Sequence, residues 1–458
     1  MPKAALHNLG CKVNAYETEA MEQLLRSAGY EIVPFDSMAD VYVINTCSVT
    51  NIADRKSRQM LHRAKKLNPQ AVVVAAGCYV QVAAEQLKAD PAVDILIGNN
   101  QKGQLAEILE EFGREGHGDP HVLDIGHTSH YEELKVERPG ERTRAFIKVQ
   151  DGCNQFCSYC IIPYARGRVR SREIGDVLGE VQALARSGYQ EVVLTGIHLS
   201  SYGLDFEKDA QLQEDYQLAA AGKNVRWLLK LIEQVSTVEN IHRIRLGSLE
   251  PRIVTEEFAY ALAANPKICP HFQLSLQSGS DSVLKRMNRH YTADEYRTIV
   301  RNLRAAFDNA AITTDIMVGF AGETEEEFAA SLAFAREIAF AKVHVFAYSR
   351  RPGTRAYDMG DQVTNAVKES RSHAMIRATT ETQRTFFDTQ VGRTEQVLFE
   401  RAVQPGVYEG YSMNYTPVLA ASGTSLAGQI RTVRIESNAG THCIGRITDG
   451  NEADAHAD

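Results

Sequence analysis

The sequence has no uninterrupted apolar run of bilayer-spanning length, and its first residues lack the apolar core of a secretory signal. Its eight cysteines are scattered over 458 residues, which excludes the dense disulfide framework of a small secreted domain. It also lacks an excess of positive charge: 50 lysines and arginines against 58 acids leave a net charge of −8. These absences indicate a cytoplasmic protein in which any contact with nucleic acid comes from local basic patches.

What the sequence does contain is an alternation of strand-like and helix-like segments, in a chain long enough for two or three domains. Over residues 1–115 this alternation predicts an α/β domain, a parallel sheet with helices on its faces. The strands are expected at Lys3–Asn8, Asp40–Asn45, Ala71–Ala76 and Val93–Ile97. Helices are expected between them, for example at Tyr16–Ser27 and Ile52–Leu67.

A linker rich in glycine, proline and charge, 116–143, precedes a second alternating region, 144–380. Its six strand–helix units predict a six-stranded open α/β barrel, a partial TIM barrel, although a flat doubly wound sheet gives the same pattern. Capping boxes predict helix starts at Thr292–Glu295 and Thr324–Glu327. The polar stretch Leu204–Asn224 is interpreted as a surface insertion.

The region 383–450 has short strand-like runs between glycine-rich turns, which predicts a small β-barrel. Between residues 385 and 450, five arginines and no lysine stand against six acids, so this barrel should attract phosphate only weakly. Residues 451–458 are expected to form a frayed acidic tail.

The densest chemical signal is Cys153, Cys157 and Cys160, three thiols spaced CxxxCxxC directly after a strand-like run. Short cysteine spacings of this kind hold iron–sulfur clusters. Three ligands would leave the fourth iron of a 4Fe-4S cluster open to a small molecule. The alternatives are a zinc site, which usually takes four protein ligands, and a redox CxxC pair, which leaves Cys153 unexplained.

Three other cysteines, Cys11, Cys47 and Cys78, are far apart in the sequence, yet each follows the end of an expected strand. The carboxyl ends of parallel strands lie along one edge of a sheet, where ligands bind in open α/β folds. We therefore expect a second metal site there, the alternative being three buried small hydrophobes. The two remaining thiols, Cys269 and Cys443, are interpreted as core or incidental residues.

Small or amide residues also follow the expected barrel strands, a rim that suits a cofactor with polar and adenine parts. They are Thr195, Gly196, Ser248 and Gln277, and Phe320 follows the fifth strand. Ordinary turn chemistry is the alternative for any single one of them.

Arginines alternate after the cysteine loop, at Arg166, Arg168, Arg170 and Arg172. In an extended segment they would project to one side, where they could contact RNA phosphates, and a solvated basic face is the alternative. The helix expected at Ile52–Leu67 carries a second basic surface.

With these residues in view, the chain resembles the radical S-adenosylmethionine (radical SAM) methylthiotransferases over nearly its whole length. The CxxxCxxC loop matches the radical SAM motif, with Tyr159 as its usual aromatic, and the three dispersed cysteines match the ligands of the family's auxiliary cluster. Further matching stretches are Leu246–Pro251, Leu274–Ser280 and Asp315–Phe320. Within the family, Leu9–Glu19 and Cys157–Arg168 resemble most the branch that acts on threonylcarbamoyladenosine in tRNA.

The resemblance implies an N-terminal methylthiotransferase domain, a radical SAM core and a C-terminal TRAM-like barrel. It implies an enzyme that adds a methylthio group to C2 of N6-threonylcarbamoyladenosine at position 37 of tRNA, with two 4Fe-4S clusters and S-adenosylmethionine as cofactors. The cluster on the CxxxCxxC loop would generate the radical, and the auxiliary cluster would carry the sulfur. The implied partners are the tRNA anticodon loop and an electron donor of flavodoxin or ferredoxin type.

Two kinds of alternative stay open at this point. A sibling enzyme would act on isopentenyladenosine-37 of tRNA or on an aspartate of a ribosomal protein. A protein of another class would be a non-catalytic, metal-braced RNA-binding protein.

Overall fold

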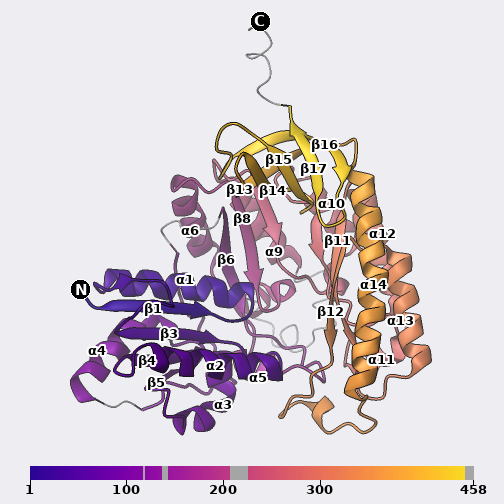
Figure 1. Cartoon of the computed structure of the whole chain (residues 1–458). Helices are drawn as coiled ribbons and strands as arrows, with labels where there is room; N and C mark the ends of the chain where they lie inside the picture. The colour runs from indigo at the N-terminus through magenta and orange to yellow at the C-terminus, as the bar shows by residue number, and fades with distance from the viewer. Residues whose placement is uncertain (117–118, 137–142, 207–224, 449–458) are drawn as a thin grey trace, which may run out of the picture.

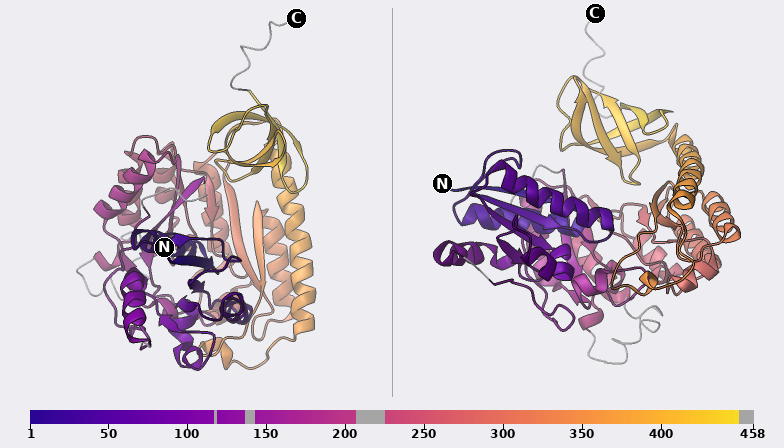
Figure 2. Two further views of the ribbon diagram at one scale, coloured as in Figure 1. Left: turned by 60° about the vertical axis from the view of Figure 1, so that its left-hand side comes forward. Right: turned by 60° about the horizontal axis from the view of Figure 1, so that its bottom comes forward.

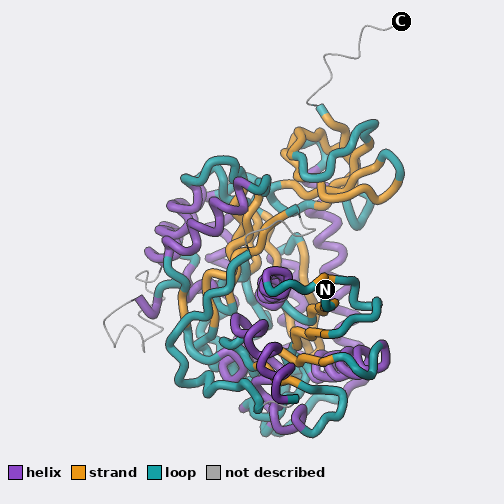
Figure 3. The backbone as a smooth tube through the Cα atoms, turned by 90° about the vertical axis from the view of Figure 1, so that its left-hand side faces the viewer, coloured by secondary structure: helices purple, strands orange, loops and turns teal. Residues whose placement is uncertain are grey.

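The structure, a computed structural model, describes the chain except residues 117–118, 137–142, 207–224 and 449–458. Three bodies follow one another along the chain: a small parallel sheet, a larger parallel sheet flanked by helices, and a closed β-barrel (Figure 1). Figure 3, seen from the side of the N-terminus, has the helices and strands of the N-terminal body in front of the larger sheet.

The N-terminal sheet has five parallel strands in the order β2-β1-β3-β4-β5. They are β1 (Lys3–Asn8), β2 (Glu31–Ile32), β3 (Val41–Thr46), β4 (Val72–Gly77) and β5 (Ile95–Ile97). The central strand β3 is buried along its whole length, as expected when helices cover both faces of a parallel sheet. One face packs on α1 (Lys12–Ser27) and α4 (Leu105–Glu115), the other on α2 (Asn51–Leu67) and α3 (Cys78–Lys88).

The four strands expected in this region are all present, and the two-residue edge strand β2 is the one that the sequence did not reveal. A short 3-10 helix, η1 (Lys102–Gln104), precedes α4.

The central body has two sheets, β7-β6-β8-β9 and β10-β11-β12, and its six parallel strands follow one another in chain order across them. They are β6 (Arg144–Asp151), β8 (Glu191–Gly196), β9 (Arg243–Leu246), β10 (His271–Gln273), β11 (Ala311–Val318) and β12 (Lys342–Ala347). The short β7 (Arg170–Ser171) pairs antiparallel with the edge of β6, and single bridges at Ile244↔Ile268 and Leu249↔Leu274 join β9 to the β10 segment. A doubly wound sheet reverses its strand order at a switch point, so the flat doubly wound alternative is wrong.

Helices alternate with these strands and enclose the largest apolar core of the molecule. They are α5 (Ile162–Arg166), α6 (Ile174–Arg186), α9 (Val225–Ser236), α10 (Glu256–Ala263), α11 (Asp281–Arg286), α12 (Ala293–Ala306), α13 (Glu325–Ile338) and α14 (Asn365–Gln390), with the 3-10 turns η2 (Leu199–Ser201), η3 (Leu204–Phe206), η5 (Pro251–Ile253) and η6 (Arg355–Tyr357). Both predicted capping boxes are present, at Thr292 with Glu295 and at Thr324 with Glu327. The predicted insertion lies almost wholly outside the described residues.

The C-terminal body is a closed barrel in the order β13-β14-β15-β17-β16, which confirms the prediction of a small β-barrel. Its strands are β13 (Thr394–Gln404), β14 (Val407–Ser412), β15 (Pro417–Ala421), β16 (Ile430–Asn438) and β17 (Cys443–Ile447). The predicted start at residue 383 falls inside α14, whose last turn contributes Phe387 to the barrel core. Cys443 lies in that core and Cys269 in the protein interior, as interpreted from the sequence. The predicted tail, 451–458, lies outside the described residues.

The barrel docks on the amino-terminal ends of the central strands. Arg243 donates hydrogen bonds to the carbonyl oxygens of Gln396 (2.7 Å) and Tyr411 (3.1 Å), and Arg245 donates one to that of Met413 (3.0 Å). The barrel therefore leaves the carboxyl ends of the central strands uncovered, as the two views of Figure 2 also show.

The segment predicted as a linker packs closely where it is described. The Tyr131 hydroxyl donates to the carbonyl oxygen of Lys148 (2.8 Å), and Leu134 and Val136 join the main core. Within the described ranges, no helix combines the length and the apolar character needed to cross a membrane.

Candidate functional site

The dispersed triplet lies at the carboxyl ends of three neighbouring strands. Cys11 is the N-cap residue of α1 after β1, Cys47 directly follows β3, and Cys78 opens α3 after β4. Because β1, β3 and β4 are adjacent in the sheet, the three thiols meet at one edge, as the sequence predicted.

Two glycines make the tight turns that bring these thiols together. Gly10 has φ +111°, and a Cβ there would lie 3.0 Å from the Cys47 sulfur. Gly77 has φ +97°, and a Cβ there would lie 2.5 Å from Asn45 Oδ1. A side chain at either position would meet both backbone strain and a close contact, so these turns require glycine.

The sulfur of Cys78 accepts hydrogen bonds from buried donors of two other segments. Arg166 Nε lies 3.2 Å from it and Asn99 Nδ2 lies 3.5 Å from it. Cys11 differs, because its side chain is exposed while burial among its neighbours raises its thiol pKa. Cys11 is thus the accessible member of the dispersed triplet, whereas Cys47 and Cys78 are buried.

The contiguous triplet occupies the loop between β6 and α5. Gly152 has φ +74°, and a Cβ there would fall 1.7 Å from the carbonyl oxygen of Arg168, so only glycine fits. The backbone N–H of Gln155 donates to the Cys153 sulfur (3.5 Å), and Arg289 Nη1 donates to the Cys157 sulfur (3.4 Å). An N–H and a guanidinium are thus aimed at these sulfurs, an arrangement that suits thiolate ligands.

Burial sets the ionisation of the free thiols. It raises the pKa of Cys47 to about 11 and that of Cys160 to about 12, and it raises the pKa of Cys153 further. These thiols hold their protons at neutral pH until a metal displaces them, which links metal loading to proton release.

The short helix α5 connects the two triplets. It begins two residues after Cys160 and ends at Arg166, whose guanidinium touches the Cys78 sulfur. Its five residues span roughly 7.5 Å. The side chain of Arg166 thus reaches from the helix after the contiguous triplet to a sulfur of the dispersed one.

The alternating arginines do not form the predicted exposed stripe. Arg166, Arg170 and Arg172 are at most 1% exposed and pair with buried carboxylates, whereas Arg168 alone is exposed, with its guanidinium over the Phe156 ring at 4.7 Å. The partners are Glu17 and Asp151 for Arg166, Asp151 for Arg170, and Glu180 for Arg172. The prediction that all four contact phosphate is wrong for the three buried ones, because their guanidiniums cannot reach a ligand outside.

Of the predicted rim residues, Thr195 and Gly196 end β8, while Ser248, Gln277 and Phe320 follow the carboxyl ends of β9, β10 and β11. The rings of Tyr159 and Phe320 are 6.4 Å apart edge to face. Thr195 lies 3.4 Å, through its hydroxyl, from where a Cβ of Gly247 would be, and Gln277 has φ +70°. Tyr159 belongs to the cysteine loop itself, whereas Thr195, Gln277 and Phe320 come from β8 and from the segments after β10 and β11.

Gly196 and Ser248 complete the rim. Gly196 is closely packed, since a Cβ there would lie 2.7 Å from Gln150 Oε1, whereas Ser248 is exposed. The rim therefore combines packed and accessible polar positions.

The sequence did not single out Arg289, Asn14, Glu17 or Asn99, all of which contact a cysteine or its arginine partner. Asn14 and Glu17 follow Cys11 by three and six residues on α1, so helical spacing from the cysteine was the available signal.

The arrangement of the cysteine sulfurs indicates which kind of metal group they could bind. Among the described residues, no three His, Cys, Asp or Glu side chains converge closely enough to hold a single ion. A lone zinc needs its sulfurs about 2.3 Å away, whereas each cysteine of an iron–sulfur cluster binds a different iron and stands further apart. Two groups of three free thiols, with cations beside them, fit two clusters better than one zinc.

Comparisons with known proteins agree with this geometry. Residues 3–98 match the Uncharacterized protein family UPF0004, and residues 147–335 match the Radical SAM superfamily. The chain is 40% identical over 440 residues to threonylcarbamoyladenosine tRNA methylthiotransferase MtaB of Bacillus subtilis (strain 168), covering 95% of this chain and 94% of that protein. It is 35% identical over 460 residues to tRNA-2-methylthio-N(6)-dimethylallyladenosine synthase of Pelotomaculum thermopropionicum, covering 98% of each.

A solved structure shares the fold at low identity. Radical S-adenosylmethionine methyltransferase TsrM of Kitasatospora setae, with cobalamin and a [4Fe-4S] cluster bound, superposes with a TM-score of 0.53 and 17% identity, covering 77% of this chain and 76% of that one.

The parallel strands and the three-cysteine loop beyond the first of them define a radical SAM protein. The chain belongs to the radical SAM tRNA methylthiotransferases, the family that its sequence resembles from end to end. Enzymes of this family use S-adenosylmethionine and carry two 4Fe-4S clusters.

Proposed function

We propose that this enzyme adds a methylthio group to C2 of N6-threonylcarbamoyladenosine-37 in tRNA. The observation that carries the proposal is the 40% identity over 95% of the chain to a relative named for that substrate. A relative named for dimethylallyladenosine matches at 35%, so the alternative base is kept as an outcome of the test.

We assign the two clusters to the two triplets. Cys153, Cys157 and Cys160 would hold the cluster that binds S-adenosylmethionine, and Cys11, Cys47 and Cys78 would hold the auxiliary cluster. When bound, these groups supply the means to break the C2–H bond and the sulfur that replaces the hydrogen. Both sets of ligands follow the carboxyl ends of strands, and Arg166 on α5 reaches from beside one set to Cys78 of the other.

We assign S-adenosylmethionine to the rim of the central strands, in what would be the open end of a partial barrel. The half-buried Tyr159 would pack against the cofactor, and the fully buried Phe320 supports its ring edge to face from the core. The polar positions are Thr195, Gly196, Ser248 and Gln277. Rim residues at strand ends are the usual site of cofactors in such folds.

Lys12 supports the choice of substrate on chemical grounds. The threonylcarbamoyl group ends in a carboxylate, whereas the isopentenyl group is apolar. Lys12 adjoins Cys11, is exposed, and within the described part of the chain its ammonium has no hydrogen bond or ion pair. Burial, followed by the charges of Arg245 and Arg144 on the central strands, lowers the pKa of Lys12, so an anion beside it would be stabilised. A free cation there would hold the carboxylate and orient the base.

The surface that first meets tRNA is proposed to lie on α2, because three of the alternating arginines are buried. Arg55 and Lys56 are exposed and have no partner among the described residues. They lie one turn after Asn51, whose amide donates to the carbonyl oxygen of Arg350 (2.9 Å) at the end of β12. This basic surface therefore adjoins both the Cys47 loop and the carboxyl ends of the central strands. An unpaired anticodon-loop base can be splayed from it into the recess.

Two further proposals follow from the chemistry. Reduction of the cluster requires a one-electron donor, for which a flavodoxin or ferredoxin type of protein is proposed. The need for reduced thiols and for tRNA fits a cytoplasmic location.

Nucleoside mass spectrometry of tRNA tests the substrate. Deletion of the gene should remove 2-methylthio-N6-threonylcarbamoyladenosine, and the wild-type chain should restore it. Loss of the isopentenyl product instead would favour the sibling activity, and an unchanged nucleoside profile would sink the proposal.

Lys12→Gln sharpens the same test in vitro. We expect kcat/KM on threonylcarbamoylated tRNA to fall about 10- to 100-fold, the effect of one charge-assisted hydrogen bond. Lys12→Arg is the matched control and should retain most activity. An equal loss with tRNA lacking the carboxylate would contradict the assigned contact.

A further inference from the structure

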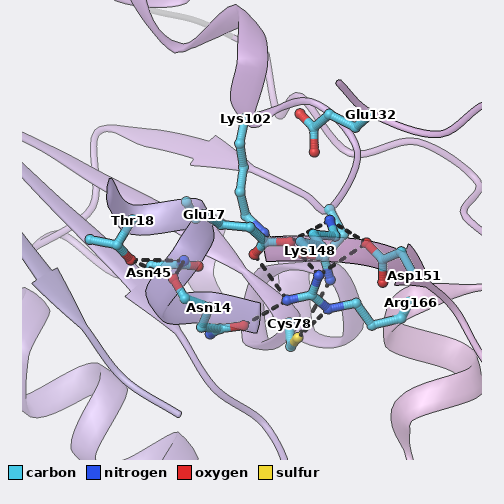
Figure 4. Close-up of polar contacts among 12 residues, drawn as sticks. Asn14, Glu17, Thr18, Asn45, Cys78, Lys102, Glu132, Lys148, Asp151 and Arg166 are labelled. Atoms are coloured by element: carbon cyan, nitrogen blue, oxygen red, sulfur yellow. Dashed lines mark hydrogen bonds and ion pairs between the residues drawn. The ribbon is translucent and has the colours of Figure 1, made fainter. Parts of the chain in front are cut away.

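Seven buried charged side chains meet where α1 packs against β6 and α5 (Figure 4). The cations are Lys102, Lys148, Arg166 and Arg170, and the carboxylates are Glu17, Glu132 and Asp151. None of them is more than 8% exposed. Such a concentration of charge at a junction between two sheets calls for a specific reason, because buried ion pairs are at best weakly stabilising.

Glu17 is the centre of the group. Its Oε1 accepts from Arg166 Nη1 (2.5 Å) and Lys148 (2.8 Å), and its Oε2 accepts from Lys102 (2.5 Å) and Arg166 Nη2 (3.0 Å). The carboxylate therefore holds the guanidinium of Arg166 by a two-point contact, and these cations keep the pKa of Glu17 well below its usual range.

The free side of the same guanidinium points at the dispersed cysteines. Arg166 Nε donates to the Cys78 sulfur at 3.2 Å, and its Nη2 donates to Asn14 Oδ1 at 2.6 Å. That oxygen also lies 3.8 Å from the sulfur of Cys11. Figure 4 shows Arg166 between Glu17 and Cys78, with Asn14 beside it.

The group has more positive than negative charge. Four cations face three carboxylates, and burial raises the pKa of one of these, Glu132, which shifts it toward its neutral form. An uncompensated charge in the interior is costly, so the site needs another anion. The geometry places the Cys78 sulfur, a proposed cluster ligand, against this excess positive charge, 3.2 Å from Arg166 Nε.

We propose that Arg166 is a positioning residue that couples the two cluster sites. Arg166 ends the helix α5, which begins two residues after Cys160, and Glu17 fixes its guanidinium. From there it would hold Cys78, a ligand of the auxiliary cluster, by a charged hydrogen bond. The inference rests on the assignment of that cluster to the dispersed triplet.

A cation and an N–H donor at a ligand sulfur favour the more negative, reduced state of a cluster, so Arg166 raises the reduction potential of the auxiliary cluster. The same contact fixes the Cys78 turn relative to the loop that carries Cys160. One side chain thus sets both the electronic state of the sulfur-bearing site and its position relative to the radical-generating one.

The test uses the full chain with Cys153, Cys157 and Cys160 all changed to Ala, so that the auxiliary cluster alone remains. Its midpoint potential is measured by redox titration followed by electron paramagnetic resonance, with and without Arg166→Gln. We expect Arg166→Gln to move the potential to more negative values, by about 59 mV for each tenfold loss in the one-electron reduction equilibrium. The spectrum of the reduced cluster should also change.

Arg172→Gln is the matched control. Its guanidinium is equally buried and pairs with Glu180, but it touches no cysteine. It should lower the thermal stability of the iron-free chain and leave the potential unchanged. Arg166→Lys keeps the charge and loses the fork, so it should fold, take up iron and show a smaller shift in the same direction.

The proposal would be overturned if the potential stayed unchanged in both Arg166→Lys and Arg166→Gln. It would also be overturned if Arg172→Gln shifted the potential as much as Arg166→Gln does. If Arg166→Gln fails to fold, the potential of Arg166→Lys decides. If the chain with Cys153, Cys157 and Cys160 changed to Ala takes up no iron, the cluster assignment itself is overturned. If it takes up iron, its measured potential tests the coupling separately.

Discussion

The two cysteine triplets reach their places in opposite ways. Cys153, Cys157 and Cys160 lie within eight residues of the loop between β6 and α5, so local chain geometry holds them. Cys11, Cys47 and Cys78 come from three strand ends and meet because β1, β3 and β4 are neighbours. The dispersed triplet also accepts a hydrogen bond from Arg166, at the end of the helix α5 that follows the contiguous one.

The difference indicates a division of labour. A contiguous loop keeps its spacing under small movements of the fold, which suits a site that must bind and cleave the same small molecule in every turnover. A site made from separate strand ends responds to the packing between domains, which suits a group that must be placed against a large substrate. Changes confined to one triplet should therefore have different consequences from changes to the other.

The largest effect should come from removing each triplet in turn. Changing Cys153, Cys157 and Cys160 to Ala should reduce S-adenosylmethionine cleavage to background, because no open iron remains. Changing Cys11, Cys47 and Cys78 to Ala should leave cleavage in place and abolish methylthio transfer. Iron content should fall from about eight to about four per chain in both cases.

Cleavage assays and iron analysis on the anaerobically reconstituted variants separate these outcomes. Equal loss of cleavage in both variants would show that the triplets do not divide the work. A single zinc per chain and no cleavage in the unchanged protein would instead favour a metal-braced RNA-binding protein.

A smaller, local effect is expected at the glycine before the contiguous triplet. Gly152→Ala places a Cβ 1.7 Å from the Arg168 carbonyl oxygen in addition to the strain of φ +74°, so we expect about 3 kcal/mol or more of destabilisation. Iron should be lost selectively from the contiguous site. Urea unfolding of the iron-free chain and iron content measure the two effects.

Gly29→Ala provides the comparison, since Gly29 has φ +87° with no atom near its Cβ position. It should lower stability by about 1–2 kcal/mol through backbone strain alone and leave both iron sites loaded. A similar loss in both variants would mean that the close contact at Gly152 has little influence on the loop.

Sequence reasoning succeeded where the signal was spacing or strand order. The CxxxCxxC loop is visible in eight residues, and the dispersed triplet could be placed because each cysteine follows a recognisable strand. The six central strands were expected, while the choice between a barrel-like and a doubly wound order needed the observed strand neighbours.

The prediction of an exposed arginine stripe was wrong for a physical reason. A run of alternating basic residues displays its charge but not its partners, and the partner of Arg166 is Glu17, 149 residues away. A carboxylate on another domain cannot be identified from local spacing, so buried cations were mistaken for surface ones. The exposure of the α2 cations Arg55 and Lys56 makes them the better candidates for contact with phosphate.

The smallest expected effect tests whether the exposed cations of α2, in place of the buried arginines, contact tRNA phosphates. Changing both Arg55 and Lys56 to Ala should weaken tRNA binding about tenfold and reduce the slope of log affinity against log salt by about 2, since each phosphate contact contributes about 0.9. Cleavage of S-adenosylmethionine without tRNA should not change, because neither side chain borders the cysteine loop. Arg63→Ala is the control on the same helix, because Arg63 is exposed but already paired with Asp36 at 2.6 Å. Filter binding at several salt concentrations measures the affinity and the salt slope. An equal change of slope in Arg63→Ala would contradict the proposal that Arg55 and Lys56 on α2 contact tRNA.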